Sequence, residues 1–153
     1  MSVVLPGLIL GGFEESFDRS ILERHGVTHV LNVAEECEVS QRVGLCYGKH
    51  GVPDDDPEAD ITAILDGCMD FMQSSTRLQG GCVFVHCLEG VSRSVCVVLC
   101  YMVLRLGWCP VKAMARLRSC RPAVDPYKPY LNQTLRKIAK TIETEYKGGA
   151  TFL

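Results

Sequence analysis

The segment from Val83 to Ser94 constrains the fold of this chain more than any other part of the sequence. The apolar run 83–85 is typical of a buried strand, and a tight loop joins it to a second apolar run that begins at Val95. At such a strand-to-helix junction, the first N–H groups of the helix lack partners and the helix dipole is positive. We therefore predict an anion site, suited to phosphate, between this strand and this helix.

Three residues of the loop carry chemistry that suits an anion site. Gly90 allows a backbone conformation that other residues resist, so that successive N–H groups can point inward. Cys87 stands at the mouth of the site, where the helix dipole, the inward amides and a guanidinium all favour the thiolate. Arg93 has a planar fork that can bind two phosphate oxygens at once. We expect Cys87 to act as a nucleophile and Arg93 to hold the phosphate.

The other loop residues complete this prediction. His86 is expected to fix the loop by hydrogen bonding, and the Ser94 hydroxyl to help the thiolate leave when a phosphocysteine is hydrolysed. A lone cysteine after an apolar strand is usually a core residue, but here histidine, glycine, arginine and serine accompany it at fixed spacing. The predicted phosphate-binding loop comprises His86, Leu88, Glu89, Gly90, Val91, Ser92 and Arg93.

Short apolar runs alternate with longer periodic ones along the chain, which is typical of a single α/β domain. Three kinds of signal predict the helices: helix caps at Asp18 and Asp60, a proline in the first turn at Pro110, and the spacing of apolar residues. Strands are predicted at 3–5, 8–10, 28–33 and 82–86, with a weaker one at 45–47, and helices at 18–26, 60–80, 93–106, 110–119 and 127–146.

Length and charge exclude several classes of protein. A chain of 153 residues suits one domain, which we place at 1–147 with a flexible tail at 148–153. The net charge of -2, with no run of lysine or arginine, argues against a nucleic-acid partner. The longest apolar stretch, 95–104, is half as long as a bilayer requires, and no signal peptide is apparent. We expect no membrane anchor and a cytoplasmic location, with the nucleus as a further compartment.

The nine cysteines are scattered and include no C-x-x-C pair, so neither a zinc site nor a disulfide framework is predicted. Most are expected to be reduced core residues. A reactive Cys87 is the thiol that peroxide should oxidise first, with Cys37 and Cys46 as the candidate partners for a disulfide. We expect no metal and no other cofactor.

The pattern H-C-x-x-G-x-x-R-S at 86–94 resembles the signature of the protein tyrosine phosphatase superfamily. The segments 5–11, 28–33 and 86–94 are similar to stretches of the small, atypical dual-specificity phosphatases, and the similarity runs from about residue 4 to residue 122. The resemblance implies a central, mostly parallel sheet flanked by helices. It also implies a shallow pocket that admits phosphotyrosine and phosphoserine or phosphothreonine of protein substrates, and no metal.

Expulsion of an alkoxide or phenolate needs a general acid, and Asp54, Asp55 and Asp56 lie between two prolines in a polar loop. Read by themselves, three adjacent acids would indicate a solvated turn. The segment that begins at Asp55 resembles the acid loop of the dual-specificity family, and Asp55 precedes Cys87 by 32 residues, which matches the family spacing. The resemblance implies Asp55 as the acid, with its two neighbours as alternatives.

The chain departs from the family after Arg121-Pro122, where relatives commonly show a Pro-Asn-x-Gly-Phe turn. Here the sequence is Pro126-Tyr127-Lys128-Pro129-Tyr130, in which Tyr127 and Tyr130 are expected either at the pocket rim or packed on a helix. That turn borders the pocket in relatives, so no substrate preference is implied.

Two alternative functions remain open. One is a catalytically weak scaffold that binds phosphoproteins, against which the presence of both Cys87 and Arg93 argues. The other is a phosphatase of inositol lipids or RNA 5′ ends, which would favour extra cations around the pocket. The loop between Cys87 and Arg93 contains no cation and one acid, Glu89, which favours a singly phosphorylated peptide.

Overall fold

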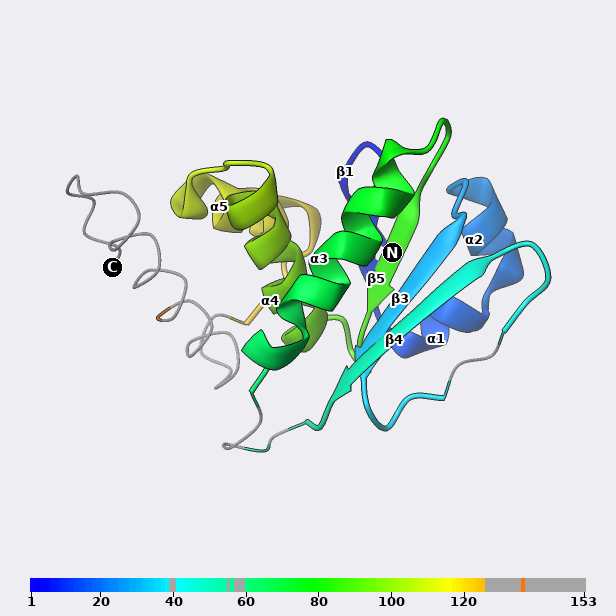
Figure 1. Ribbon diagram of the computed structural model, residues 1–153, viewed down its shortest axis with the longest axis horizontal. Coiled ribbons are helices and arrows are strands. Elements are labelled where there is room, and N and C mark those ends of the chain that lie inside the picture. Colours follow the sequence, from blue (N-terminus) through cyan, green and yellow to red (C-terminus); the bar gives the residue numbers. More distant parts are fainter. Residues whose placement is uncertain (39–40, 55, 57–59, 126–135, 137–153) are drawn as a thin grey trace.

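A five-stranded sheet forms the centre of the molecule (Figure 1). The computed structural model describes residues 1–38, 41–54, 56, 60–125 and 136. The strand order is β1-β2-β5-β3-β4, with β1 antiparallel to β2 and the other pairs parallel. The strands are β1 (Ser2–Leu5), β2 (Leu8–Gly11), β3 (His29–Ala34), β4 (Cys46–Val52) and β5 (Val83–His86). The predicted α/β fold with a mostly parallel sheet is confirmed.

Helices cover both faces of the sheet (Figure 1). Short helices α1 and α2 lie on one side, and α3, α4 and α5 lie on the other. The helices are α1 (Phe13–Phe17), α2 (Arg19–Arg24), α3 (Thr62–Arg77), α4 (Arg93–Cys100), the π-helical turn η1 (Tyr101–Arg105) and α5 (Pro110–Cys120). No helix of the described part of the chain has the length and apolarity of a membrane span.

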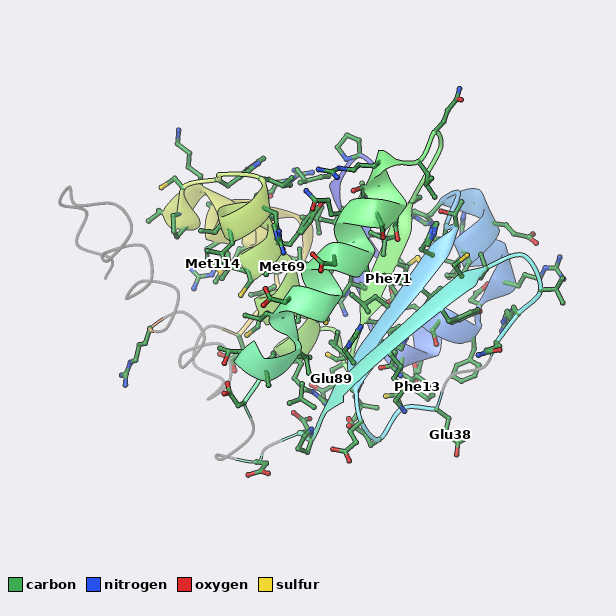
Figure 2. All side chains as sticks on the ribbon, in the orientation of Figure 1. Phe13, Glu38, Met69, Phe71, Glu89 and Met114 are labelled. Carbon is green, nitrogen blue, oxygen red and sulfur yellow. The ribbon has the colours of Figure 1, made fainter. Side chains whose placement is uncertain are left out.

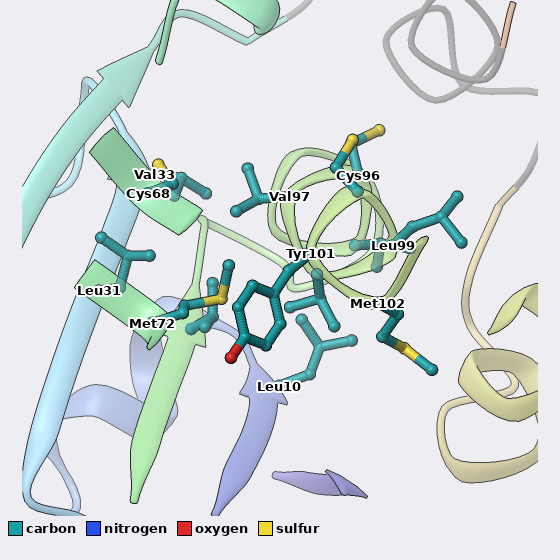
Figure 3. Close-up of a cluster of buried hydrophobic side chains, with 14 of the residues drawn as sticks. Leu10, Leu31, Val33, Cys68, Met72, Cys96, Val97, Leu99, Tyr101 and Met102 are labelled. Carbon is teal, nitrogen blue, oxygen red and sulfur yellow. The ribbon is translucent and has the colours of Figure 1, made fainter. Parts of the chain in front are cut away.

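The alternation of side chains along β5 divides the core into two layers. Val83 and Val85 face the larger layer, which α3, α4 and α5 complete, whereas Phe84 faces a smaller layer with Leu22 of α2. All eight residues of α4 are buried, as the apolar run that begins at Val95 predicts for the last six. Figure 3 shows the larger layer, with side chains from β2, β3, α3 and α4 around Tyr101 of η1. The loop before α4 is therefore attached to a fully buried helix.

Short sequence patterns predicted most helix ends to within a few residues. The carboxylate of Asp18 accepts the Ile21 N–H at 3.0 Å, and that of Asp60 accepts the Thr62 N–H at 3.0 Å. Gly26, two residues after the end of α2, has φ +64°, and Pro110 is the first residue of α5. The expected helix 127–146, the tail 148–153, Tyr127 and Tyr130 lie outside the described residues.

Two elements differ from the prediction. α1 was not expected, because five residues are too few to show a helical repeat. β4 continues to Val52 although 48–51 contains two glycines, a lysine and a histidine. Parallel pairing with β3, from His29 opposite Cys46 to Ala34 opposite Val52, determines this strand in spite of poor strand propensity.

Candidate active site

The carboxyl ends of the parallel strands bring the predicted site residues together. His86, the last residue of β5, pairs with Gly11 of β2 on one side and with Asn32 of β3 on the other. The segments that follow β2, β3, β4 and β5 therefore emerge at one edge of the sheet, which is where open α/β sheets bind ligands. Figure 2 shows Phe13 and Glu89, from two of these segments, at that edge.

The loop after β5 forms a nest around the sulfur of Cys87, which is only 3 % exposed. The Gly90 N–H lies 3.2 Å from Cys87 Sγ, and the Ser94 hydroxyl donates to the same sulfur at 3.3 Å. Gly90 has φ +71°, and a Cβ at this position would lie 2.3 Å from the Gly11 carbonyl oxygen. Glycine is thus required here by backbone conformation and by space.

A hollow opens beside the sulfur, with about 210 Å³ of empty space that merges with the solvent. Its lining includes Ser92, whose hydroxyl is the one buried side-chain polar atom of the described residues without a hydrogen-bond partner. A buried hydroxyl of this kind commonly has a ligand or water as its partner. The hollow is lined by Asp54, Cys87, Glu89, Val91, Ser92 and Arg93.

Arg93 is 1 % exposed and is held by the ends of two neighbouring strands. Its Nη1 and Nη2 donate to the two carboxylate oxygens of Glu36 at 2.7 and 2.5 Å, and Nη1 also donates to the Val52 carbonyl at 2.8 Å. Asp54 lies 3.3 Å from Nη2. This bidentate pair fixes the plane of the guanidinium at the hollow.

The charges around Arg93 stabilise one another. The hydrogen bond from Arg93 holds the pKa of Glu36 below its ordinary value, although burial opposes this. Burial tends to lower the pKa of Arg93, but Glu36, Cys87 and Asp54 outweigh it and the pKa is raised. The arginine therefore keeps its charge, as a phosphate ligand must.

His86 is buried directly before the nucleophile candidate. Its Nδ1 lies 3.2 Å from the Cys87 carbonyl oxygen, and its ring stacks on Phe84 with centroids 5.4 Å apart. Burial lowers the pKa of His86 to about 4, and the contact with the Cys87 carbonyl opposes that shift. The ring is accordingly neutral at physiological pH.

The structure brings the predicted loop residues together around the hollow and places two acidic residues, Glu36 and Asp54, beside Arg93. Asp55 lies outside the described residues, whereas its neighbour Asp54 faces Arg93. Glu36 was not predicted, because no motif marks it. Its position two residues after β3 was the available signal, since carboxyl ends of parallel strands converge.

The cysteines also need one correction. Six are buried, but Cys46 and Cys109 are exposed, and all nine are free thiols in the described chain. Cys46 cannot reach Cys87, because it begins β4 opposite His29, which pairs with Val83. Four residues of strand, about 13 Å, separate that level from Cys87, which exceeds disulfide reach. No cluster of three or more possible metal ligands occurs among the residues that the structure describes.

Comparison with known proteins decides the family. Residues 8–140 match the family described as "Dual specificity phosphatase, catalytic domain". The chain belongs to the dual specificity phosphatase family. It is 30% identical over 142 residues to dual specificity protein phosphatase 1 of Arabidopsis thaliana, covering 93% of this chain and 70% of that protein. Dual specificity protein phosphatase 22-B of Danio rerio is 32% identical over 155 residues, with 94% and 81% covered.

The dual specificity phosphatase fold is also found by structural comparison. The crystal structure of human DUSP28 superposes with a TM-score of 0.84 at 28% identity, covering 95% of this chain and all of that one. The sheet and helices described above are therefore those of a dual-specificity phosphatase. The chain is a protein phosphatase of this family, as its cysteine loop predicted.

Proposed function

We propose that this phosphatase hydrolyses phosphotyrosine and phosphoserine or phosphothreonine in proteins through a phosphocysteine formed on Cys87. The single observation that carries the proposal is the environment of the sulfur. The Gly90 N–H and the Ser94 hydroxyl both donate toward Cys87 Sγ, an arrangement that stabilises negative charge on the sulfur when it departs from phosphorus. A cysteine that served only the core would need neither donor.

The proposed reaction has two steps. Cys87 Sγ attacks phosphorus, the bond from phosphorus to the substrate oxygen breaks, and Asp55 delivers the proton that this oxygen needs. Water then attacks the phosphocysteine, Asp55 takes a proton from that water, and the sulfur–phosphorus bond breaks to release phosphate. The Ser94 hydroxyl, 3.3 Å from Sγ, stabilises the departing thiolate.

Arg93 and Ser92 supply the phosphate contacts in this proposal. Glu36 and the Val52 carbonyl hold the guanidinium from one side, and Asp54 stands beside Nη2. A phosphate that accepts from Nε and from the second N–H of Nη2 displaces Asp54 and leaves Glu36 in place, because the bidentate contact of Glu36 is the stronger. The unpartnered Ser92 hydroxyl lies in the same hollow and can donate to a phosphate oxygen.

The test is hydrolysis of an aryl phosphate and of phosphopeptides without added metal. Wild-type protein should turn over these substrates and be inhibited by vanadate, whereas Cys87→Ser should bind inorganic phosphate without turnover, because a hydroxyl is far too weakly acidic to attack at neutral pH. Arg93→Lys should be severely impaired, since a point charge cannot replace the fork. Turnover by Cys87→Ser close to that of wild type would refute the mechanism.

Protein substrates are proposed over inositol lipids because of Glu89. This exposed carboxylate lines the hollow and would repel a second phosphate group. Phosphopeptides should show higher kcat/KM than any inositol lipid, and Glu89→Lys should narrow the difference. A preference of the wild type for a polyphosphorylated lipid or an RNA triphosphate end would refute the substrate class.

A further inference from the structure

Three consecutive carbonyl groups on the outer side of the phosphate-binding loop are held by residues from elsewhere in the chain. The Leu88 oxygen accepts the Phe13 N–H at 2.8 Å. The Glu89 oxygen accepts Arg121 Nη2 at 2.8 Å, and the Gly90 oxygen accepts Arg121 Nε at 2.6 Å. A single guanidinium therefore binds two successive peptide units of the loop.

These contacts bear directly on the sulfur, because a trans peptide directs its N–H opposite to its C=O. In the peptide that joins Glu89 to Gly90, both the carbonyl oxygen and the N–H have a partner. Its oxygen points outward to Arg121, and its N–H points inward to Cys87 Sγ at 3.2 Å. The oxygen of Gly90, also on Arg121, belongs to the peptide whose N–H is that of Val91. Because Arg121 holds the Glu89 and Gly90 oxygens on the outer side of the loop, the N–H groups of Gly90 and Val91 are directed to its inner side.

Arg121 is itself well fixed. It directly follows α5, its backbone N–H donates to the Leu117 carbonyl at 2.8 Å, and its side chain is 18 % exposed. Nη1 lies 3.9 Å from the carboxylate of Glu15. Glu15 in turn accepts the Gly12 N–H at 2.7 Å, next to the amide that holds Leu88. The loop is therefore clamped between the start of α1 and the end of α5.

We propose that Arg121 is a positioning residue of the phosphatase, whose guanidinium turns the Gly90 and Val91 amides toward the Cys87 sulfur and the bound phosphate. The inference rests on the cysteine mechanism proposed above. Arg121 acts through the loop and not on the substrate, because its Nε and Nη2 donate to the loop carbonyls. The planar fork matters more than the charge, since lysine cannot reach two carbonyls with one fixed geometry.

The deciding variant is Arg121→Lys, which keeps the positive charge and removes the fork. Arg118→Lys is the matched control, because Arg118 is exposed in the last turn of the same helix. Arg121→Lys should lower kcat/KM roughly tenfold to a hundredfold, the order expected when reacting groups are misplaced by about 1 Å. It should also weaken binding of inorganic phosphate, measured calorimetrically in the Cys87→Ser background. Arg118→Lys should match wild type in both assays.

Alkylation of Cys87 by iodoacetamide near neutral pH, followed by mass spectrometry of its peptide, separates positioning from general destabilisation. Loss of inward amides should slow the reaction, because the thiolate is the reactive form. Simple loosening of the fold would expose this buried sulfur and speed the reaction. Slower alkylation in Arg121→Lys supports the proposal, and unchanged or faster alkylation overturns it.

The outcome is separable from the proposed function. If wild-type protein fails to hydrolyse phosphopeptides, the proposed function is refuted, while phosphate binding and alkylation of Cys87 still test the positioning role of Arg121. If wild type is active and Arg121→Lys equals it in turnover, phosphate binding and alkylation, the positioning role of Arg121 is refuted and the proposed function stands.

Discussion

Asp54 and Asp55 are adjacent in the chain, and we expect them to have different roles. Asp55→Asn should slow phosphoryl transfer by roughly 10²- to 10⁴-fold and remove the basic limb of the pH–rate profile, because the proton donor is lost. Asp54→Asn should change kcat little and should bind inorganic phosphate more tightly, because a carboxylate 3.3 Å from Arg93 competes with phosphate.

Single-turnover kinetics and phosphate titration of Asp54→Asn, Asp55→Asn and Asp56→Asn check this division, with Asp56→Asn as the control for charge removal in the loop. A larger loss of kcat in Asp54→Asn than in Asp55→Asn would move the general acid by one residue.

His86 makes stability depend on pH. Its folded pKa is about 4 and its ordinary value is 6.5, so between these values the unfolded chain takes up a proton that the folded chain refuses. The free energy of unfolding should therefore fall as the pH is lowered from 6.5 to about 4, by up to about 3 kcal/mol. Glu36, whose folded pKa is depressed from 4.5, adds to the loss only below that value.

Urea unfolding across this pH range checks the prediction. In His86→Asn, the free energy of unfolding should depend less on pH above pH 4.5, where Glu36 does not yet contribute. The variant should also be less stable at neutral pH, because the stacking of the His86 ring on Phe84 is lost. A slope in His86→Asn equal to that of wild type would assign the acid sensitivity to other groups.

At the scale of elements, the phosphate-binding loop requires glycine at position 90, whereas Gly80, which has almost the same backbone conformation elsewhere in the chain, should tolerate alanine. Gly90 and Gly80 have φ +71° and +72°, but a Cβ at Gly80 would meet nothing within 4 Å. Gly80→Ala should therefore cost only the backbone strain, about 1 kcal/mol, and leave activity unchanged. Gly90→Ala must also push the loop away from the Gly11 carbonyl, so it should cost more and abolish phosphate binding.

Thermal unfolding and phosphate calorimetry on the two alanine variants test this pair. Equal losses of stability with phosphate binding retained in both would show that the close contact with Gly11 is not needed for the loop.

Elements set by short-range signals could be predicted from the sequence, and those set by tertiary pairing could not. The cap at Asp18, the stop at Gly26 and the start at Pro110 act within one helical turn, so the residues alone reveal them. The extension of β4 through two glycines depends on β3 beside it. A single sequence contains no sign of that pairing.

The same distinction applies to the active site. His86, Cys87, Arg93 and Ser94 are close in sequence, so one motif identifies them. Glu36 and Arg121 act on that motif from 57 and 31 residues away, and only the folded sheet brings them there. Their side chains are ordinary surface types, for which solvent exposure is the usual expectation.

At the scale of the whole molecule, the sheet order decides which cysteine can protect the nucleophile from oxidation. Cys37 follows β3 at the carboxyl edge, where Cys87 follows β5, whereas Cys46 lies at the opposite end of β4. Burial and the neighbouring Glu36 raise the pKa of Cys37, so that this sulfur remains a thiol at neutral pH.

Peroxide should oxidise Cys87 to a sulfenic acid, with peroxide reduced to water, and the Cys37 thiol should then condense with it, forming a disulfide and releasing a second water. Because Cys37 is held as a thiol, this second step should be slow, and the sulfenic acid should be trapped first by dimedone. Activity should return with dithiothreitol in wild type and in the control Cys46→Ser, but only partly in Cys37→Ser, where sulfinic acid accumulates. Mass spectrometry that finds Cys87 linked to another cysteine, or not linked to Cys37 at all, would rule out this pairing.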